Sequence, residues 1–270
     1  MPNPQLTNPG AITESDWKYY LGHTPESLLQ EIAEGLKNEN RYFVDERFQR
    51  LLFTYFFDPQ SRFFAQTEIT PSATLYRARI YNEPDAMDRF DAPVKYDQFQ
   101  GYDRGKSSAP PSENAGDGRA NPNGIRYLYT ASDPETAIKE ARAQPGEFVS
   151  VATVKPRARI MLADLSNSFS ALEAESIDKT KWINTFVLCL ESYFQRPQKT
   201  IGSYYLCQYV SEYVKVWGFG GIRYRASTIQ KTLGSDSVNV TFFHPENCEI
   251  VSSKLYYLAE STLTMEPPIN

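Results

Sequence analysis

Two arginines on one face of a short strand are the first side chains in this sequence whose spacing suggests chemistry. Residues 74 to 80 read as a strand, and period-two alternation puts Arg77 and Arg79 on one face. Guanidinium groups match the geometry of phosphate oxygens and stay charged at any working pH. The pair is therefore a candidate phosphate grip, with the alternative that one of the two arginines is simply solvated.

A second group of polar side chains lies between Gly118 and Arg142. Arg119 sits in the turn-rich loop GRANPNG, Tyr129 lies near a strand end, and Glu140 is on the helix that follows. Because the loop, strand and helix are consecutive, the three side chains can meet in one cleft and bind an anionic ligand. The alternative is a strand-turn-helix unit that carries ordinary surface charges.

The elements that position this second group follow from local sequence signals. Alternating residues predict a strand from 125 to 130, and a helix follows in which Ser132 or Asp133 is the N-cap and Pro134 occupies the first turn. Glu135, three residues after Ser132, fits a capping box.

The rest of the chain predicts an α+β protein with mixed, mostly antiparallel sheets and flanking helices. Residues 1 to 22 are expected to form an irregular arm, and helices are expected near residues 24 to 36 and 48 to 58. We expect residues 1–70 to be a helical N-terminal extension and residues 71–270 to be the main domain. Further strands are expected at 148–154, 160–165, 222–226, 238–243 and 250–258, and further helices at 182–190 and 206–217.

Residues 82 to 123 contain no periodic pattern and are rich in Asp, Gly, Pro, Ser and Asn. A connection of this length in a compact domain is usually a functional loop or partly disordered. We expect a loop that covers the cleft and brings Phe99, Tyr102 and Asp117 close to it.

Composition narrows the class of function. The net charge of −5 and pI near 5.3 argue against direct nucleic-acid binding and against an anionic membrane surface. No apolar run is long enough to span a membrane and no signal peptide is visible, so a cytoplasmic protein is expected. Two histidines and three widely spaced cysteines give no metal-ligand pattern, so no metal is expected.

Four motifs in order resemble the RES domain, a family named for an arginine, a glutamate and a serine. They are LYRAR, GRANPNGIRYLY, ETAIKEAR and GGIRYRAS, and they fall between about residues 74 and 245. The chain departs from compact members of the family in its length and in its long 82–123 loop. The resemblance implies a fold similar to that of the ADP-ribosyltransferase toxins and an NAD+-degrading or ADP-ribosyl-transferring enzyme. Such an enzyme is often the toxin of a bacterial toxin–antitoxin pair with an Xre-like, helix-turn-helix antitoxin.

The resemblance also implies roles for individual residues. It puts Arg77, Glu140 and Ser227 in the catalytic set and Arg119 and Tyr129 in substrate binding. Further substrate contacts are expected from Tyr127, which competes with Tyr129 for the tyrosine role, and from Arg79 and Asn121.

The implied reaction breaks the bond between nicotinamide and ribose. Positive charge builds on the ribose in the transition state, and a fixed carboxylate, assigned to Glu140, stabilises it. Arg77 and Arg119 hold the pyrophosphate or an attacking inorganic phosphate, Tyr129 borders the nicotinamide, and Ser227 bonds the ribose or the carboxamide. NAD+ is then a substrate of a glycohydrolase or phosphorylase.

Two alternatives remain from the sequence. The same site could transfer ADP-ribose to a protein. In a different class, the chain could be a non-catalytic binding or assembly module, because the apolar stripe from Phe48 to Phe56 must be buried against its own domain or a partner such as a second copy of the chain.

Overall fold

The computed structural model describes residues 9–41, 44–58, 65–91, 98–166, 177–195, 204–226 and 237–259. These residues form two compact units, each built from separated stretches of the chain. Unit 1 comprises Met1–Thr67, Gly116–Asn123 and Met161–Arg225, and unit 2 comprises Glu68–Ala115, Gly124–Ile160 and Ala226–Asn270.

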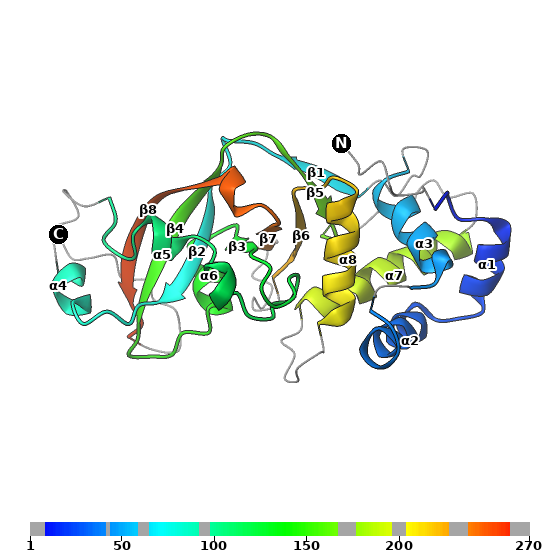
Figure 1. Cartoon of the computed structure of the whole chain (residues 1–270), viewed down its shortest axis with the longest axis horizontal. Coiled ribbons are helices and arrows are strands. Elements are labelled where there is room, and N and C mark those ends of the chain that lie inside the picture. Colours follow the sequence, from blue (N-terminus) through cyan, green and yellow to red (C-terminus); the bar gives the residue numbers. More distant parts are fainter. Residues whose placement is uncertain are drawn as a thin grey trace. The chain divides into compact units, whose positions relative to one another are not determined.

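Unit 1 is mainly helical (Figure 1). Its helices are α1 (Glu14–Leu21), α2 (Pro25–Asn38), α3 (Glu46–Phe56), α7 (Ile177–Gln195) and α8 (Tyr205–Val216). The parallel strands β5 (Ile160–Asp164) and β6 (Gly221–Arg225) accompany them, and β1 (Gln66–Ile69) lies next to β5 at the boundary of the units. The helices expected in an N-terminal extension thus share a body with α7 and α8.

Aromatic side chains fill the core of unit 1. Phe48 of α3 packs against Phe186 of α7 with ring centroids 6.3 Å apart, and Tyr20 of α1 packs against Trp182 of α7 at 5.2 Å. The stripe from Phe48 to Phe56 is therefore buried within its own unit, and its burial requires no partner.

The expectation of an irregular arm up to residue 22 is wrong, because α1 forms there. Its N-cap is Thr13, whose hydroxyl accepts from the backbone of Asp16 at 3.1 Å, and the Asp16 carboxylate accepts from the Thr13 amide at 2.9 Å. Asp16 also pairs with Arg50 of α3 at 2.8 Å. The prediction relied on the polar composition of this segment and missed a capping box in which Asp16 takes the place of the usual Glu.

Unit 2 contains five antiparallel strands in the order β7-β3-β2-β4-β8. They are β2 (Leu75–Ile80), β3 (Leu128–Ala131), β4 (Phe148–Pro156), β7 (Val238–Phe242) and β8 (Cys248–Tyr257), and the helices are α4 (Ala86–Phe90), α5 (Arg104–Ser107) and α6 (Pro134–Glu140), with the 3₁₀ turns η1 (Ser112–Asn114) and η2 (Pro245–Asn247). The expected α+β class with mostly antiparallel strands is confirmed.

The two faces of this sheet have different covers. On the first, here called the α6 face, Ile138 of α6 packs with Val149 and Val151 of β4 and with Tyr76 of β2. On the opposite face, here called the loop face, the segment 98–107 packs against the strands: the amide of Tyr102 donates to Ser150 Oγ at 2.9 Å. Figure 1 shows α6 beside β2 and β3.

Part of the expected 82–123 loop therefore covers the sheet. The isolated bridge between Phe99 and Ser253 and the hydrogen bond from Ser253 Oγ to the carbonyl of Tyr102, 2.7 Å long, fix it in place. Gly101 is required at this point, since a Cβ there would lie 2.3 Å from Ser150 Oγ. Asp117, by contrast, belongs to unit 1.

The other expected helices and strands are present with different ends, whereas β1, α4 and α5 are not expected from the sequence. Strand β3 begins at Leu128 rather than at residue 125, because Arg126 turns away to donate from Nε to the carbonyl of Pro110 at 2.7 Å. Of the helices among the described residues, none is both long and apolar enough to cross a membrane.

Candidate active site

The candidate site of unit 2 lies where strands β2 and β3 stop pairing. Strand β2 pairs with β4 over six residue pairs, but its ladder with β3 consists of the single pair Tyr76 and Ala131. Beyond that pair, Arg77 follows on β2 and Tyr129 lies on β3. We call this place the β2–β3 split.

The guanidinium of Arg77 occupies the split. Its Nη1 donates to the backbone carbonyl of Tyr129 at 3.1 Å, an acceptor that a continued ladder would have given to a β2 amide. Its Nε is shielded from solvent and has no hydrogen-bond partner among the described residues. Buried polar atoms are nearly always paired, so an unpaired guanidinium nitrogen marks a place where a ligand can bind.

The charge of Arg77 is also not compensated by any acidic group in the described parts of the chain. Burial, and to a smaller extent the charge of Arg79, lower the pKa of Arg77 from 12.5 to about 10, while Tyr129 acts in the opposite direction. No carboxylate of the described residues forms an ion pair with it. A buried cation without an acidic partner is costly and is typical of anion sites.

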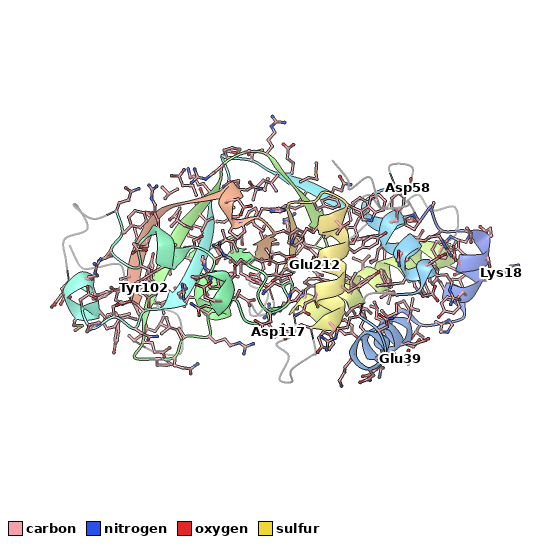
Figure 2. The ribbon with its side chains drawn as sticks, in the orientation of Figure 1. Lys18, Glu39, Asp58, Tyr102, Asp117 and Glu212 are labelled. Carbon is pink, nitrogen blue, oxygen red and sulfur yellow. The ribbon has the colours of Figure 1, made fainter. Side chains whose placement is uncertain are left out.

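Arg79 has a different environment on the loop face. Its Nη1 donates to the carbonyl of Lys106, and its guanidinium carbon lies 5.6 Å from the ring centre of Tyr102, which Figure 2 labels. Both contacts hold the covering segment 98–107 onto the sheet. As a site residue, Arg79 remains a prediction.

Glu140 is the last residue of α6, and a buried amide holds its carboxylate. Asn239 of β7 donates from Nδ2 to Glu140 Oε1 at 2.9 Å, and Asn239 is only 5% exposed. Asn239 pairs with Ala131, which pairs with Tyr76, so all three lie on the α6 face. Glu140 thus reaches β7 from the α6 face. Arg77 alternates with Tyr76 along β2 and so belongs to the opposite face, from which its guanidinium reaches the carbonyl of Tyr129 in the split.

Capping fixes the start of α6. Asp133, one of the two expected N-caps, accepts from the amide and the hydroxyl of Thr136, both at 2.8 Å, and from Ser132 Oγ at 3.0 Å. Burial raises the pKa of Asp133, but these hydrogen bonds outweigh it and leave the pKa lowered. The expected capping box of Ser132 and Glu135 is not the one used, because Glu135 instead pairs with Lys139 at 2.6 Å.

The two candidate tyrosines differ in how deeply their side chains are buried. Tyr127 precedes β3, is 2% exposed, and packs against Phe243 with ring centroids 4.9 Å apart. Tyr129 lies within β3, pairs with Thr241 and is partly exposed. Tyr129 is therefore the better placed to border a ligand, and Tyr127 serves the core.

Arg119 and Asn121 belong to unit 1, in the loop 116–123. Gln208 of α8 anchors this loop by donating from Nε2 to the carbonyls of Gly118 and Asn121, at 3.0 and 3.1 Å. Asn121 is buried and donates to the carbonyl of Gly116 at 2.9 Å. Their predicted contacts with substrate remain predictions, and Ser227 lies outside the described residues.

Asn239 is the site residue that sequence reasoning missed. The strand VNVTF is buried at every position, yet it carries Asn and Thr at alternate positions. A polar residue in the middle of a fully buried strand needs a specific partner, and that signal would have identified it. No group of three or more His, Cys, Asp or Glu side chains suited to a metal ion occurs in the described ranges.

The family model of the RES domain matches residues 75–260, so the chain belongs to the RES domain family. The matched span starts at β2 and contains Arg77, Glu140 and Ser227. Among solved structures, the chain is similar to one from the MbcT–MbcA toxin–antitoxin complex of M. tuberculosis, at 13% identity and a TM-score of 0.40, over 71% of this chain and 88% of that chain. No curated protein matches this chain.

Proposed function

We propose that this chain is an enzyme that consumes NAD+ by breaking the bond between nicotinamide and ribose. The observation that carries the proposal is the guanidinium of Arg77 in the β2–β3 split, which has no carboxylate partner and an unpaired Nε among the residues that the structure describes. A pyrophosphate would supply both the missing charge and the missing acceptor. Membership of the RES family supports NAD+ as the carrier of that pyrophosphate.

Glu140 supplies the second requirement of the reaction. Nicotinamide leaves as a neutral molecule and positive charge develops on the ribose, so a fixed carboxylate lowers the barrier without transferring a proton. The hydrogen bond from Asn239 holds Oε1 of the Glu140 carboxylate at 2.9 Å. Attack by water then gives ADP-ribose and a proton, whereas attack by inorganic phosphate gives ADP-ribose 1″-phosphate.

The test is release of nicotinamide from NAD+, followed by chromatography with and without phosphate. We expect Glu140→Gln to lower the rate by at least about 100-fold, by analogy with the loss of other electrostatic groups that act in the transition state. The matched control is Glu135→Gln on the same helix, whose side chain is exposed and pairs with Lys139. Equal rates for the two variants would contradict the proposal.

A second experiment, with radiolabelled NAD+, identifies the acceptor of the ADP-ribose. Radiolabelled NAD+ that marks a protein band, with little free ADP-ribose, would identify a protein ADP-ribosyltransferase instead.

We further propose that the chain acts as a toxin held by a protein antitoxin of the helix-turn-helix class. The support is the family to which the chain belongs. An enzyme that removes NAD+ would stop the growth of the cell that contains it, so such a cell needs a protein that inhibits the enzyme. Expression of the wild type should arrest growth and lower cellular NAD+, and expression of Glu140→Gln should do neither. Growth arrest by Glu140→Gln would separate toxicity from NAD+ consumption.

A further inference from the structure

We infer that Asn239 is the positioning residue for Glu140, and that it orients the carboxylate for the transition state. This inference rests on the proposed function and extends it to a residue outside the R, E and S motifs. Its geometric basis is the 2.9 Å hydrogen bond from Asn239 Nδ2 to Glu140 Oε1.

The position of Glu140 makes such a donor necessary. Glu140 ends α6, where the last carbonyl groups present the negative end of the helix dipole, and a carboxylate is disfavoured there. The backbone turns immediately afterwards, because Arg142 has a φ of 55°. An amide donor that faces the end of α6 offsets this electrostatic disadvantage and selects one direction for the side chain.

Asn239 is itself held rigidly enough to do this. It lies within β7, pairs with Ala131 of β3 and is 5% exposed. A side chain enclosed in a strand of a packed sheet has few available rotamers. The amide of Asn239 therefore holds the Glu140 carboxylate in a fixed position relative to the sheet. The carboxylate of a short helix is thereby fixed relative to β3, which also accepts the hydrogen bond of Arg77.

The same strand offers a matched control. Thr241 lies two residues further along β7 on the same face and is fully buried. Its hydroxyl has no hydrogen-bond partner among the described residues. Thr241→Val keeps the shape of the side chain, so it reports the cost of altering this buried strand without removing a donor to Glu140.

The experiment compares Asn239→Leu and Thr241→Val in steady-state nicotinamide release, with Asn239→Ala as a second variant that puts less bulk into the core. We expect both Asn239 variants to lower kcat by about 10- to 100-fold with KM for NAD+ little changed, as for other hydrogen bonds that orient a reacting group. Thr241→Val should retain the kcat of the wild type. A wild-type kcat in a folded Asn239 variant, or an equal loss in Thr241→Val, would overturn the inference.

A crystal structure of Asn239→Leu gives a readout that does not depend on turnover. The Glu140 carboxylate should be displaced or divided between two conformers, and an unchanged, single position would also overturn the inference. An inactive wild type would instead refute the proposed function, and the displacement of Glu140 would still decide the role of Asn239.

Discussion

Replacement of Arg77 by methionine should leave unit 2 at least as stable as it is in the wild type while it abolishes anion binding. Methionine fills a similar volume but carries no charge, so it removes a buried cation that has no acidic partner in the described parts of the chain. Most substitutions of buried residues destabilise a protein, and the opposite result is expected here because the charge is retained for a ligand.

The magnitude follows from the lowered pKa. A fall from 12.5 to about 10 corresponds to an upper limit of about 3.5 kcal/mol, since each pKa unit is worth about 1.4 kcal/mol. Arg77 keeps some contact with solvent, which reduces the penalty to about 1 to 2 kcal/mol. Loss of the hydrogen bond to Tyr129 offsets about 1 kcal/mol. The net change is therefore between about zero and 1 kcal/mol in favour of the variant.

The sign of the pH dependence is also fixed. Because the pKa of Arg77 is lower in the folded than in the unfolded state, the penalty is fully present below pH 10 and declines only as the pH rises through 10 toward 12.5. The difference in stability between Arg77→Met and wild type should therefore be constant from pH 6 to pH 9.

Thermal unfolding with and without ADP-ribose measures both parts of this prediction. The wild type should gain stability from the ligand and Arg77→Met should not. Arg79→Met, altered two residues away on the same strand, serves as the control for stability alone. A loss of more than about 1 kcal/mol in Arg77→Met, well beyond its hydrogen bond, or undiminished stabilisation by ADP-ribose would refute the reasoning.

Three further substitutions test the supports of the fold. Glu191→Gln should destabilise unit 1 by about 3 kcal/mol in urea unfolding, because Glu191 is enclosed and accepts from Arg225 Nε at 2.9 Å and Nη2 at 2.5 Å; a change below about 1 kcal/mol would show that the pair is solvated. Arg142→Gly should raise the stability of unit 2 by about 0.5 to 1 kcal/mol, because it relieves a left-handed backbone after α6, and a lower thermal midpoint would contradict this. Asp133→Ala should lower the free energy of unfolding by about 1 kcal/mol at pH 7, and by less as the pH falls through the lowered pKa of Asp133. A loss of stability that does not change with pH would contradict the role of Asp133 as the N-cap.

The sequence predicts the elements of this protein where a single physical signal dominates. The stripe from Phe48 to Phe56 requires a helix, and α3 is there; alternation around Arg77 requires a strand, and β2 is there. Pro134 and the two candidate N-caps, Ser132 and Asp133, locate the start of α6 to within one residue, and Asp133 is the N-cap in the structure. These predictions hold because each depends on neighbours within a few positions along the chain.

The site could be predicted only in part, because its geometry depends on contacts between distant residues. The single pairing of β2 with β3, which frees the carbonyl of Tyr129 for Arg77, has no counterpart in the local pattern. The bond between Asn239 and Glu140 joins positions 99 apart in sequence. The assignment of the helices before residue 67 and of the loop 116–123 to one unit is likewise a tertiary property.

A crystal structure of the Glu140→Gln variant with NAD+ tests the central claim most directly. The account predicts a phosphate oxygen within about 3.2 Å of a guanidinium nitrogen of Arg77, and the ribose that bears nicotinamide next to residue 140. NAD+ bound elsewhere, with Arg77 still bonded only to the carbonyl of Tyr129, would contradict it.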